Sequence, residues 1–208
     1  MIFQHSILTI LWITYCVVHS LFASIRVKIY LEKKLGYLFR YYRLLYSLFA
    51  TITLVFIIYY QYSIKSILLI KSPLIGYLSL IVFLIPGFIL MLVSIYKYFR
   101  LLSGIRALYH KKEISILRVD GIHKYIRHPL YSGTLLFLSG MFFIFPLLSN
   151  FIAVFIIALY VILGLRLEEK KLVLEFGDSY KAYRANVPML IPNFKKTSNK
   201  KGGQFGHP

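Results

Sequence analysis

The chain has 208 residues, of which 59% are apolar and 15% are charged. This balance excludes an ordinary soluble domain and indicates an integral membrane protein. The formal net charge is +18, yet the lysines and arginines flank apolar stretches instead of forming a soluble basic face, so we expect no nucleic-acid partner.

Five apolar stretches are long enough to cross a lipid bilayer, which takes roughly 20 helical residues. They predict an all-α membrane protein with about five transmembrane helices and a cytoplasmic C-terminal amphipathic helix. We interpret the first stretch as a retained transmembrane helix, because no basic region precedes it as in a signal peptide. The predicted spans are 3–25, 43–63, 74–98, 130–148 and 150–166.

Positive charge alternates between the two ends of these spans. Six, eight and nine basic residues fall in segments 26–43, 97–128 and 166–208, and only Lys65 and Lys71 fall elsewhere. The positive-inside rule therefore predicts an outside N-terminus and a cytoplasmic C-terminus, with the basic segments facing the anionic headgroups of the lipid bilayer. All seven acidic residues lie on the same side, so we expect any polar chemistry to face the cytoplasm.

The polar connections carry recognisable boundaries. Pro146 and Ser149-Asn150 separate the last two spans and predict a tight helical hairpin. Gly177 is expected to end the amphipathic helix that continues past the fifth span. Beyond it, the segment 187–192 is predicted to be an extended strap.

These boundaries predict three parts. Residues 1–100 form a three-helix transmembrane part. Residues 101–192 form a catalytic part that contains the connector, the helical hairpin, the amphipathic helix and the strap. Residues 193–208 are polar and glycine-rich, and we expect a disordered tail.

The most informative motif is Arg127-His128-Pro129-Leu130-Tyr131, at the mouth of the fourth span. Its simplest interpretation is a positive flank followed by a helix-starting proline. Arg127 and His128 can also hold an anionic group together, and Tyr131 adds a ring and a hydroxyl one turn into the helix. Because such groups are costly at a membrane helix, we favour a functional site.

A second polar cluster, Glu168-Glu169, follows the fifth span. Adjacent acids on a helix usually form a solvated face that pairs with nearby lysines, but a carboxylate at the inner end of a span can also bind a cationic ligand. The apolar stripe of Leu165 and Leu172 predicts that Glu168 lies nearer the bundle, so we favour Glu168. His19 is costly inside the first span, and an interhelical hydrogen bond explains it as well as a functional role does.

Gly133 and Gly140 lie seven residues apart, on one face of the fourth span. Close helix packing is the simplest explanation for this spacing. The alternative, more specific explanation is that a ligand lies against the bare backbone of these glycines.

Several common site motifs are missing from the sequence. The single Cys16 excludes an internal disulfide and a multi-cysteine metal site. No set of His, Cys and Asp residues has the spacing of metal ligands. Neither the glycine motif of a dinucleotide-binding fold nor a nucleophile elbow is present.

Four motifs occur in a fixed order, and the resemblance that they carry covers roughly 115–192: Gly121-x-x-x-Tyr-x-Arg-His-Pro-x-Tyr-x-Gly133, Glu168-Glu-x-x-Leu172, Phe176-Gly-x-x-Tyr180-x-x-Tyr183 and Val187-Pro-x-x-Ile-Pro192. As a set they resemble the isoprenylcysteine carboxyl methyltransferase family. That superfamily also includes phospholipid N-methyltransferases and bacterial thiol S-methyltransferase-like proteins. The first three spans match it only loosely.

The resemblance implies a methyltransferase that uses S-adenosylmethionine at its cytoplasmic face. It implies that Arg127, Arg166 and Glu168 are catalytic, with Arg166 the nearest candidate for an arginine on the substrate side. Glu168 would also hold the polar end of the cofactor. The cofactor contacts that it implies are Ser115, Ile116, Leu117, Arg118, His123, His128, Pro129, Leu130, Tyr131 and Glu168.

Under this hypothesis the protein aligns acceptor, methyl and sulfur about 3 Å apart and excludes water from them, with no dedicated base. We expect a lipophilic acceptor, first an isoprenylcysteine-type carboxylate, with a small thiol or a phospholipid amine as alternatives. A non-enzymatic transporter or assembly factor would keep the helices but bind no S-adenosylmethionine. Substituting Glu168→Gln or Arg127→Ala is expected to abolish methyl transfer and leave a folded protein.

Overall fold

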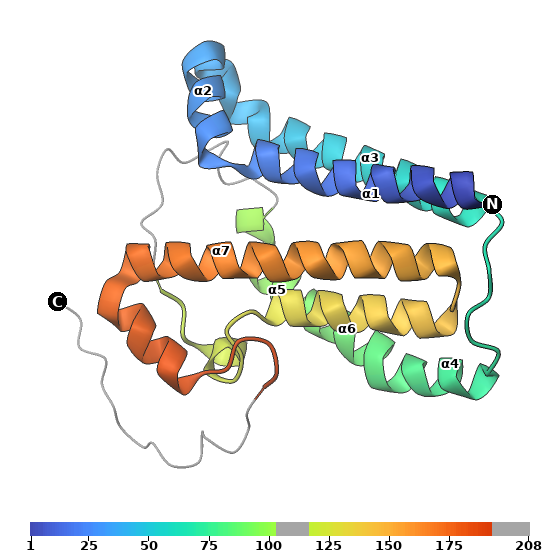
Figure 1. Cartoon of the computed structure of the whole chain (residues 1–208). Helices are drawn as coiled ribbons and strands as arrows, with labels where there is room; N and C mark the ends of the chain where they lie inside the picture. The colour runs from blue at the N-terminus through green and yellow to red at the C-terminus, as the bar shows by residue number, and fades with distance from the viewer. Residues whose placement is uncertain (103–116, 193–208) are drawn as a thin grey trace.

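The computed structural model describes residues 1–102 and 117–192, with side chains described up to residue 96 and again from residue 117. Within these ranges the long helices lie side by side (Figure 1). Four helices are long and apolar enough to cross a membrane, and Pro129–Ile144 is a shorter apolar helix. The predicted all-α membrane fold is thus confirmed, and the chain is a multi-pass integral membrane protein.

The N-terminal part is a pair of long helices with a short helix between them. They are α1 (Ile2–Ala23) and α3 (Tyr42–Ser63), joined by α2 (Ile25–Leu35) and a 3-10 turn, η1 (Gly36–Tyr41). The Ser24 hydroxyl accepts a hydrogen bond from the Val27 amide and so caps the start of α2. The break at Ser24 lets the chain turn before it re-enters the bundle.

Buried polar groups link three helices within the apolar bundle. The Trp12 indole donates to the Gln61 side chain at 2.9 Å, and the Gln61 amide donates to Asn150 at 2.6 Å. These groups lie beside an apolar cluster that includes Leu8 and Ile57. Since lipid offers no hydrogen bonds, Trp12, Gln61 and Asn150 satisfy one another inside the bundle.

The third span is one helix interrupted by a looser segment. It consists of α4 (Pro73–Ser79), a π-helical segment η2 (Leu80–Leu84) and α5 (Ile85–Leu102). Pro86 has no amide hydrogen, and its ring clashes with the carbonyl four residues earlier in a regular α-helix. That carbonyl lies in η2, where the wider turn accommodates the proline.

Helix α6 (Pro129–Ile144) packs against α5 and η2 at very close range. A Cβ atom on Gly140 would lie 2.7 Å from the Leu84 backbone nitrogen, and a Cβ atom on Gly133 would lie 2.9 Å from the Met91 backbone nitrogen. Real Cβ atoms do not approach backbone so closely. Close helix packing is therefore the confirmed role of Gly133 and Gly140, and the alternative of a ligand against these glycines is wrong.

We expect Gly140→Ala to destabilise the protein by about 1–3 kcal/mol, because the added methyl group has no room beside Leu84. The matched control is Gly164→Ala on the last helix, where a Cβ atom meets nothing within 4 Å. That control should be neutral or stabilising, since alanine favours a helix over glycine. Thermal unfolding of both variants in one detergent checks this, and equal midpoints would contradict the packing.

Helix α7 (Leu148–Asn186) lies between α1 and α6 (Figure 1). The hairpin before it is closed by residues 145–147, which include Pro146. Ser149 and Asn150 were expected in this connection but lie in the first turn of α7. The Asn150 side chain donates instead to the Phe145 carbonyl at 2.6 Å and so ties the connection to the helix start.

Gly177 bends α7 sharply, with φ 54° and ψ −129°, a conformation that favours glycine. The predicted end of the amphipathic helix is confirmed as this kink, and the following turns fold back beside the start of α6 (Figure 1). The strap, residues 187–192, follows as irregular chain. Thus α2, the start of α6 and the kinked end of α7 gather at one end of the bundle.

Candidate functional site

The two polar clusters predicted from the sequence meet at that end of the bundle. Arg127, just before α6, donates from Nε and Nη2 to the two carboxylate oxygens of Glu169 on α7, at 3.0 and 3.1 Å. This is a bidentate pair, the strongest arrangement of arginine with a carboxylate. Both side chains are about nine-tenths buried.

Glu169 accepts further hydrogen bonds from both sides. His128 Nε2 lies 2.6 Å from its Oε1, and the Tyr180 hydroxyl donates to the same oxygen at 2.6 Å. We call Arg127, His128, Glu169 and Tyr180 the Glu169 clamp. It joins the start of α6 to α7 on both sides of the Gly177 kink.

The expectation that Glu168 lies nearer the bundle than Glu169 is wrong. The buried stripe of α7 follows Val161, Leu165 and Glu169 at intervals of four residues, and Glu169 is 8% exposed. Glu168 lies one residue off this stripe and is half-buried. The apolar spacing around Leu165 therefore identified the right stripe but the wrong acid.

The Glu169 clamp also holds the strap. Arg127 Nη1 donates to the carbonyls of Arg184 and Val187 at 3.0 and 2.7 Å. The amides of Arg127 and His128 donate to the carbonyls of Pro188 and Met189. The strap is thus paired along the residues that precede α6.

The connector before α6 is fixed by a second set of contacts. It contains a short 3-10 turn, η4 (Gly121–Lys124). The Tyr183 hydroxyl donates to the His123 carbonyl at 2.7 Å, and His123 Nδ1 lies 3.0 Å from the Arg127 carbonyl. His123 is therefore held beside the Glu169 clamp.

Glu168 has a different environment from its neighbour. The Tyr131 hydroxyl donates to Glu168 Oε2 at 2.7 Å. None of the ion pairs within 1–96 and 117–192 involves Glu168. Its carboxylate is thus next to the Glu169 clamp, half-buried, and not neutralised by any cation that the structure describes. Such a group can attract a positively charged ligand.

The other predicted site residues differ in burial and in position. Pro129 is buried and Leu130 is half-buried at the start of α6, and Leu117 is half-buried before η4. Arg118 and Arg166 are exposed, and the Arg166 side chain forms no hydrogen bond with another described residue. Ser115 and Ile116 lie outside the described residues, as does the predicted tail 193–208.

Tyr180 and Ser132 contribute to the site but were not among the predicted site residues. Tyr180 is 1% exposed and bonds Glu169, and Ser132 donates to the strap carbonyl of Leu190 at 2.8 Å. Tyr180 belongs to one of the ordered motifs, so the sequence offered a signal that could have identified it. Ser132 carried no signal, because a serine one turn into a helix is commonplace.

The pKa of the Glu169 carboxyl is set by opposing effects. Burial favours the neutral acid and acts to raise the pKa, but hydrogen bonds from Tyr180 and His128 and the charge on Arg127 outweigh it, so the pKa lies below its usual value. A carboxyl whose folded pKa is depressed stabilises the fold above its unfolded pKa, which is about 4.3 for glutamate. This stabilisation is lost as the pH falls through the folded pKa.

We therefore expect the stability difference between the unsubstituted protein and a Glu169→Gln variant to depend on pH. The difference should be largest near pH 7 and should shrink as the pH falls below about 4. Thermal unfolding of both proteins from pH 7 to pH 3 measures it. A difference that stays constant over this range would contradict a charged Glu169 in the clamp.

Comparison with known proteins assigns a family to this arrangement. A family model described as NnrU protein matches residues 7–191, a range that includes the bundle, the Glu169 clamp and most of the strap. The chain belongs to the NnrU protein family. No solved structure matches the chain significantly.

Curated relatives of this NnrU family member have methyltransferase names. It is 31% identical over 162 residues to a Methanethiol S-methyltransferase of Crocosphaera subtropica, which covers 74% of the chain and 62% of the relative. It is 32% identical over 108 residues to a Methanethiol S-methyltransferase of Pseudomonas deceptionensis, covering 50% and 40%. It is 41% identical over 81 residues to a Protein-S-isoprenylcysteine O-methyltransferase of Schizosaccharomyces pombe, covering 37% and 33%.

These matches confirm the predicted resemblance. In each case, however, the alignment spans less than two thirds of the relative's length.

Proposed function

We propose that this protein is a membrane methyltransferase that transfers a methyl group from S-adenosylmethionine to a small thiol. The observation that carries the proposal is the contrast between two adjacent carboxylates. Glu169 is neutralised inside the Glu169 clamp, whereas Glu168 is held by Tyr131 without a described cation. A rigidly placed, uncompensated carboxylate at the inner end of a span supports binding of a cationic donor.

The residues around Glu168 fit the proposed donor. When bound, S-adenosylmethionine supplies a methyl group on a positively charged sulfonium, and it also carries an amino group. Glu168 would bind a cationic end of the donor through charge-assisted hydrogen bonds. Tyr131 fixes the carboxylate, and Leu130, which precedes Tyr131 on α6, is a half-buried apolar side chain.

The Glu169 clamp suggests a changed role for two predicted site residues. Arg127 and His128 use their side chains on Glu169 and on the strap. We therefore propose that they are positioning residues, which hold the start of α6 and thereby Tyr131 in place. Arg166 stays a candidate for a contact on the acceptor side.

A small thiol is the preferred acceptor because relatives in different bacteria carry the name Methanethiol S-methyltransferase. The second candidate is the carboxylate of an isoprenylcysteine, which the local 41% identity to the Schizosaccharomyces pombe relative favours. A cytoplasmic location of the donor end, with the N-terminus outside, is part of the proposal and follows from the distribution of basic residues.

A direct assay distinguishes these acceptors. The purified full chain in lipid nanodiscs is incubated with methyl-labelled S-adenosylmethionine and with methanethiol, a longer alkyl thiol or a prenylcysteine. We expect saturable transfer to the thiols and a kcat/KM at least tenfold lower for the prenylcysteine. Preferred transfer to the prenylcysteine would favour the second candidate, and no transfer to any of them would refute the proposed function.

A further inference from the structure

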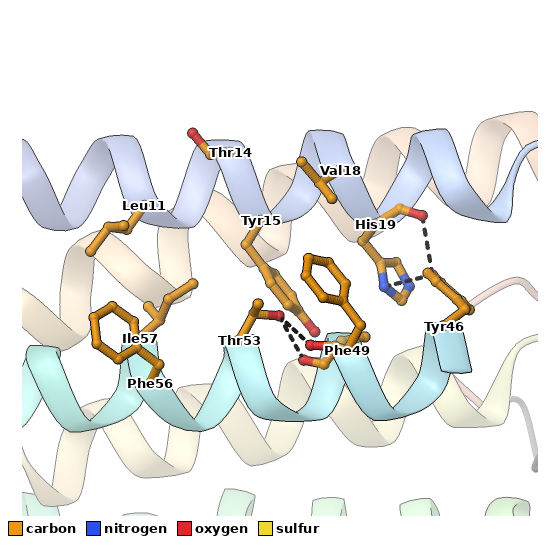
Figure 2. Close-up of a pocket in the computed structure, with 11 residues that line it drawn as sticks. Leu11, Thr14, Tyr15, Val18, His19, Tyr46, Phe49, Thr53, Phe56 and Ile57 are labelled. Atoms are coloured by element: carbon orange, nitrogen blue, oxygen red, sulfur yellow. Dashed lines mark hydrogen bonds between the residues drawn. The ribbon is translucent and has the colours of Figure 1, made fainter. Parts of the chain in front are cut away.

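A second feature of the bundle is an apolar cavity between α1 and α3, away from the Glu169 clamp. Its volume is about 160 Å³, close to that of an engineered apolar cavity of about 150 Å³ that binds benzene. Figure 2 shows side chains from both helices pointing into the space between them. The lining residues include Tyr15 and His19 of α1 and Tyr46 and Ala50 of α3.

His19 is the basic group in this cavity, and its hydrogen-bond partner is Tyr46. The Tyr46 hydroxyl lies 2.7 Å from His19 Nδ1 and can donate to the His19 carbonyl, which is 3.1 Å away (Figure 2). We assign the imidazole proton to Nδ1, where the Tyr46 oxygen accepts it while the hydroxyl donates to the carbonyl. Nε2 then carries the free lone pair of the imidazole. It has no hydrogen-bond partner among the residues that the structure describes.

The rings that contact His19 belong to three tyrosines, and the Cys16 thiol lies one turn earlier on α1. Tyr15 on α1 stacks on its ring, Tyr46 packs from α3, and Tyr160 packs edge-on from α7. None of the described ion pairs includes His19. The imidazole is thus a base surrounded by aromatic rings and without a described ion pair. Such a group is costly to keep within a membrane span.

One face of α7 connects this cavity to Glu168. Tyr160, Gly164 and Glu168 are four residues apart and share that face, and the whole interval is about 12 Å at helical rise. Tyr160 accepts a hydrogen bond from Ser20 beside His19, at 3.2 Å. At Gly164, midway, a Cβ atom would meet nothing within 4 Å. At its midpoint, this face of α7 therefore presents open space beside bare backbone.

We propose that the α1–α3 cavity binds a compact apolar thiol and that His19 Nε2 accepts the proton of that thiol. This inference rests on the proposed methyl transfer and adds to it the acceptor site and a base. The cavity volume suits a thiol with a short hydrocarbon body. The apolar lining favours such a body over a polar one.

The proposed step is balanced. The thiol S–H bond breaks as its proton moves to His19 Nε2, and the sulfur electron pair forms the new bond to the donor methyl. The bond between that methyl and the donor sulfur breaks, and its electron pair stays with the donor sulfur. The products are a thioether, the neutral demethylated donor and an imidazolium. This proposal replaces the expectation that no dedicated base is required, because an un-ionised thiol in an apolar cavity has no water to take its proton.

Trp12, the single tryptophan of the chain, reports on the cavity without any turnover. Its ring contacts Tyr15 edge-on at 6.0 Å between centroids. We expect 4-bromobenzenethiol to quench Trp12 fluorescence saturably in the full-length protein in nanodiscs, and short alkyl thiols to compete. Ala50→Leu, which adds bulk to the lining, should weaken this binding at least tenfold. The matched control Ala23→Leu, at the exposed end of α1, should bind as the unsubstituted protein does.

Two results of the binding experiment would overturn the proposal. One is quenching that does not saturate or that is the same in Ala50→Leu and Ala23→Leu. The other is full quenching of Trp12 by phospholipids with brominated acyl chains that thiols do not relieve, because an acyl chain would then be the occupant.

His19→Phe keeps the ring in place and removes the base. We expect kcat for a thiol to fall about 100-fold or more near pH 7, with thiol binding changed only a few-fold. The loss should shrink as the pH approaches the thiol's own pKa, where the acceptor ionises without help. Tyr46→Phe, which removes the partner of Nδ1, should lower kcat less. An unchanged kcat and pH profile in His19→Phe would refute the role of His19 as a base.

The inference and the proposed function can fail separately. Saturable quenching of Trp12 without methyl transfer would leave the cavity assigned and remove the proposed function. Methyl transfer to thiols that is unaffected by both Ala50→Leu and His19→Phe would leave the function and remove this inference.

Discussion

Glu168→Gln is expected to abolish methyl transfer at ordinary donor concentrations while the protein keeps its fold. The glutamine oxygen can still accept from Tyr131, so the local structure survives. The missing negative charge removes a partly desolvated pairing with the cationic donor, which costs about 3 kcal/mol, or roughly 100-fold in donor affinity. Initial rates at varied S-adenosylmethionine concentrations measure this as a fall in kcat/KM.

Two neighbouring substitutions serve as controls for this prediction. Glu175→Gln removes the same charge from an exposed position of α7 and should leave the kinetics unchanged. Glu169→Gln should lower thermal stability, because it breaks the Glu169 clamp. If Glu168→Gln retained full kcat/KM for the donor, Glu168 would not be the donor carboxylate.

Arg127→Ala is expected to destabilise the protein strongly rather than to remove a ligand contact. The substitution deletes four hydrogen bonds and leaves Glu169 buried without its arginine. Breaking a buried ion pair in this way costs about 3–5 kcal/mol. Thermal unfolding should show the loss, and methyl transfer should fall with the folded fraction.

The matched control is Arg184→Ala, since Arg184 is exposed and contributes its backbone carbonyl, which the substitution keeps. It should change stability by less than about 0.5 kcal/mol. The sequence alone predicted a folded Arg127→Ala variant without activity. A variant as stable as the unsubstituted protein but unable to bind the donor would restore that earlier expectation and contradict a purely positioning role.

The spans and the meeting of the two polar clusters could be predicted from the sequence because hydropathy and charge fix them. The bilayer requires long apolar helices, and helix ends rich in charge gather on one side. The finer pattern at Glu168-Glu169 could not be predicted from the apolar spacing of α7. The choice between these acids depends on Arg127 and Tyr180, which approach from other parts of the chain.

The connections were harder to predict than the spans. Ser149 and Asn150 resemble loop residues, yet Asn150 lies in α7 because its side chain satisfies the Phe145 carbonyl and Gln61. The interhelical hydrogen bond of His19, one of its two predicted roles, is present with Tyr46. The sequence could not show that His19 also lines a cavity, because the other lining residues come from both α1 and α3.

The central claim is that Glu168 holds a cationic methyl donor, and calorimetric titration with S-adenosylhomocysteine, which shares the donor's amino group, tests it directly. The purified full chain in nanodiscs should show saturable binding with one site per chain, and Glu168→Gln should show none at the same concentrations. Absence of binding to the unsubstituted protein, or equal binding to both proteins, would contradict the account.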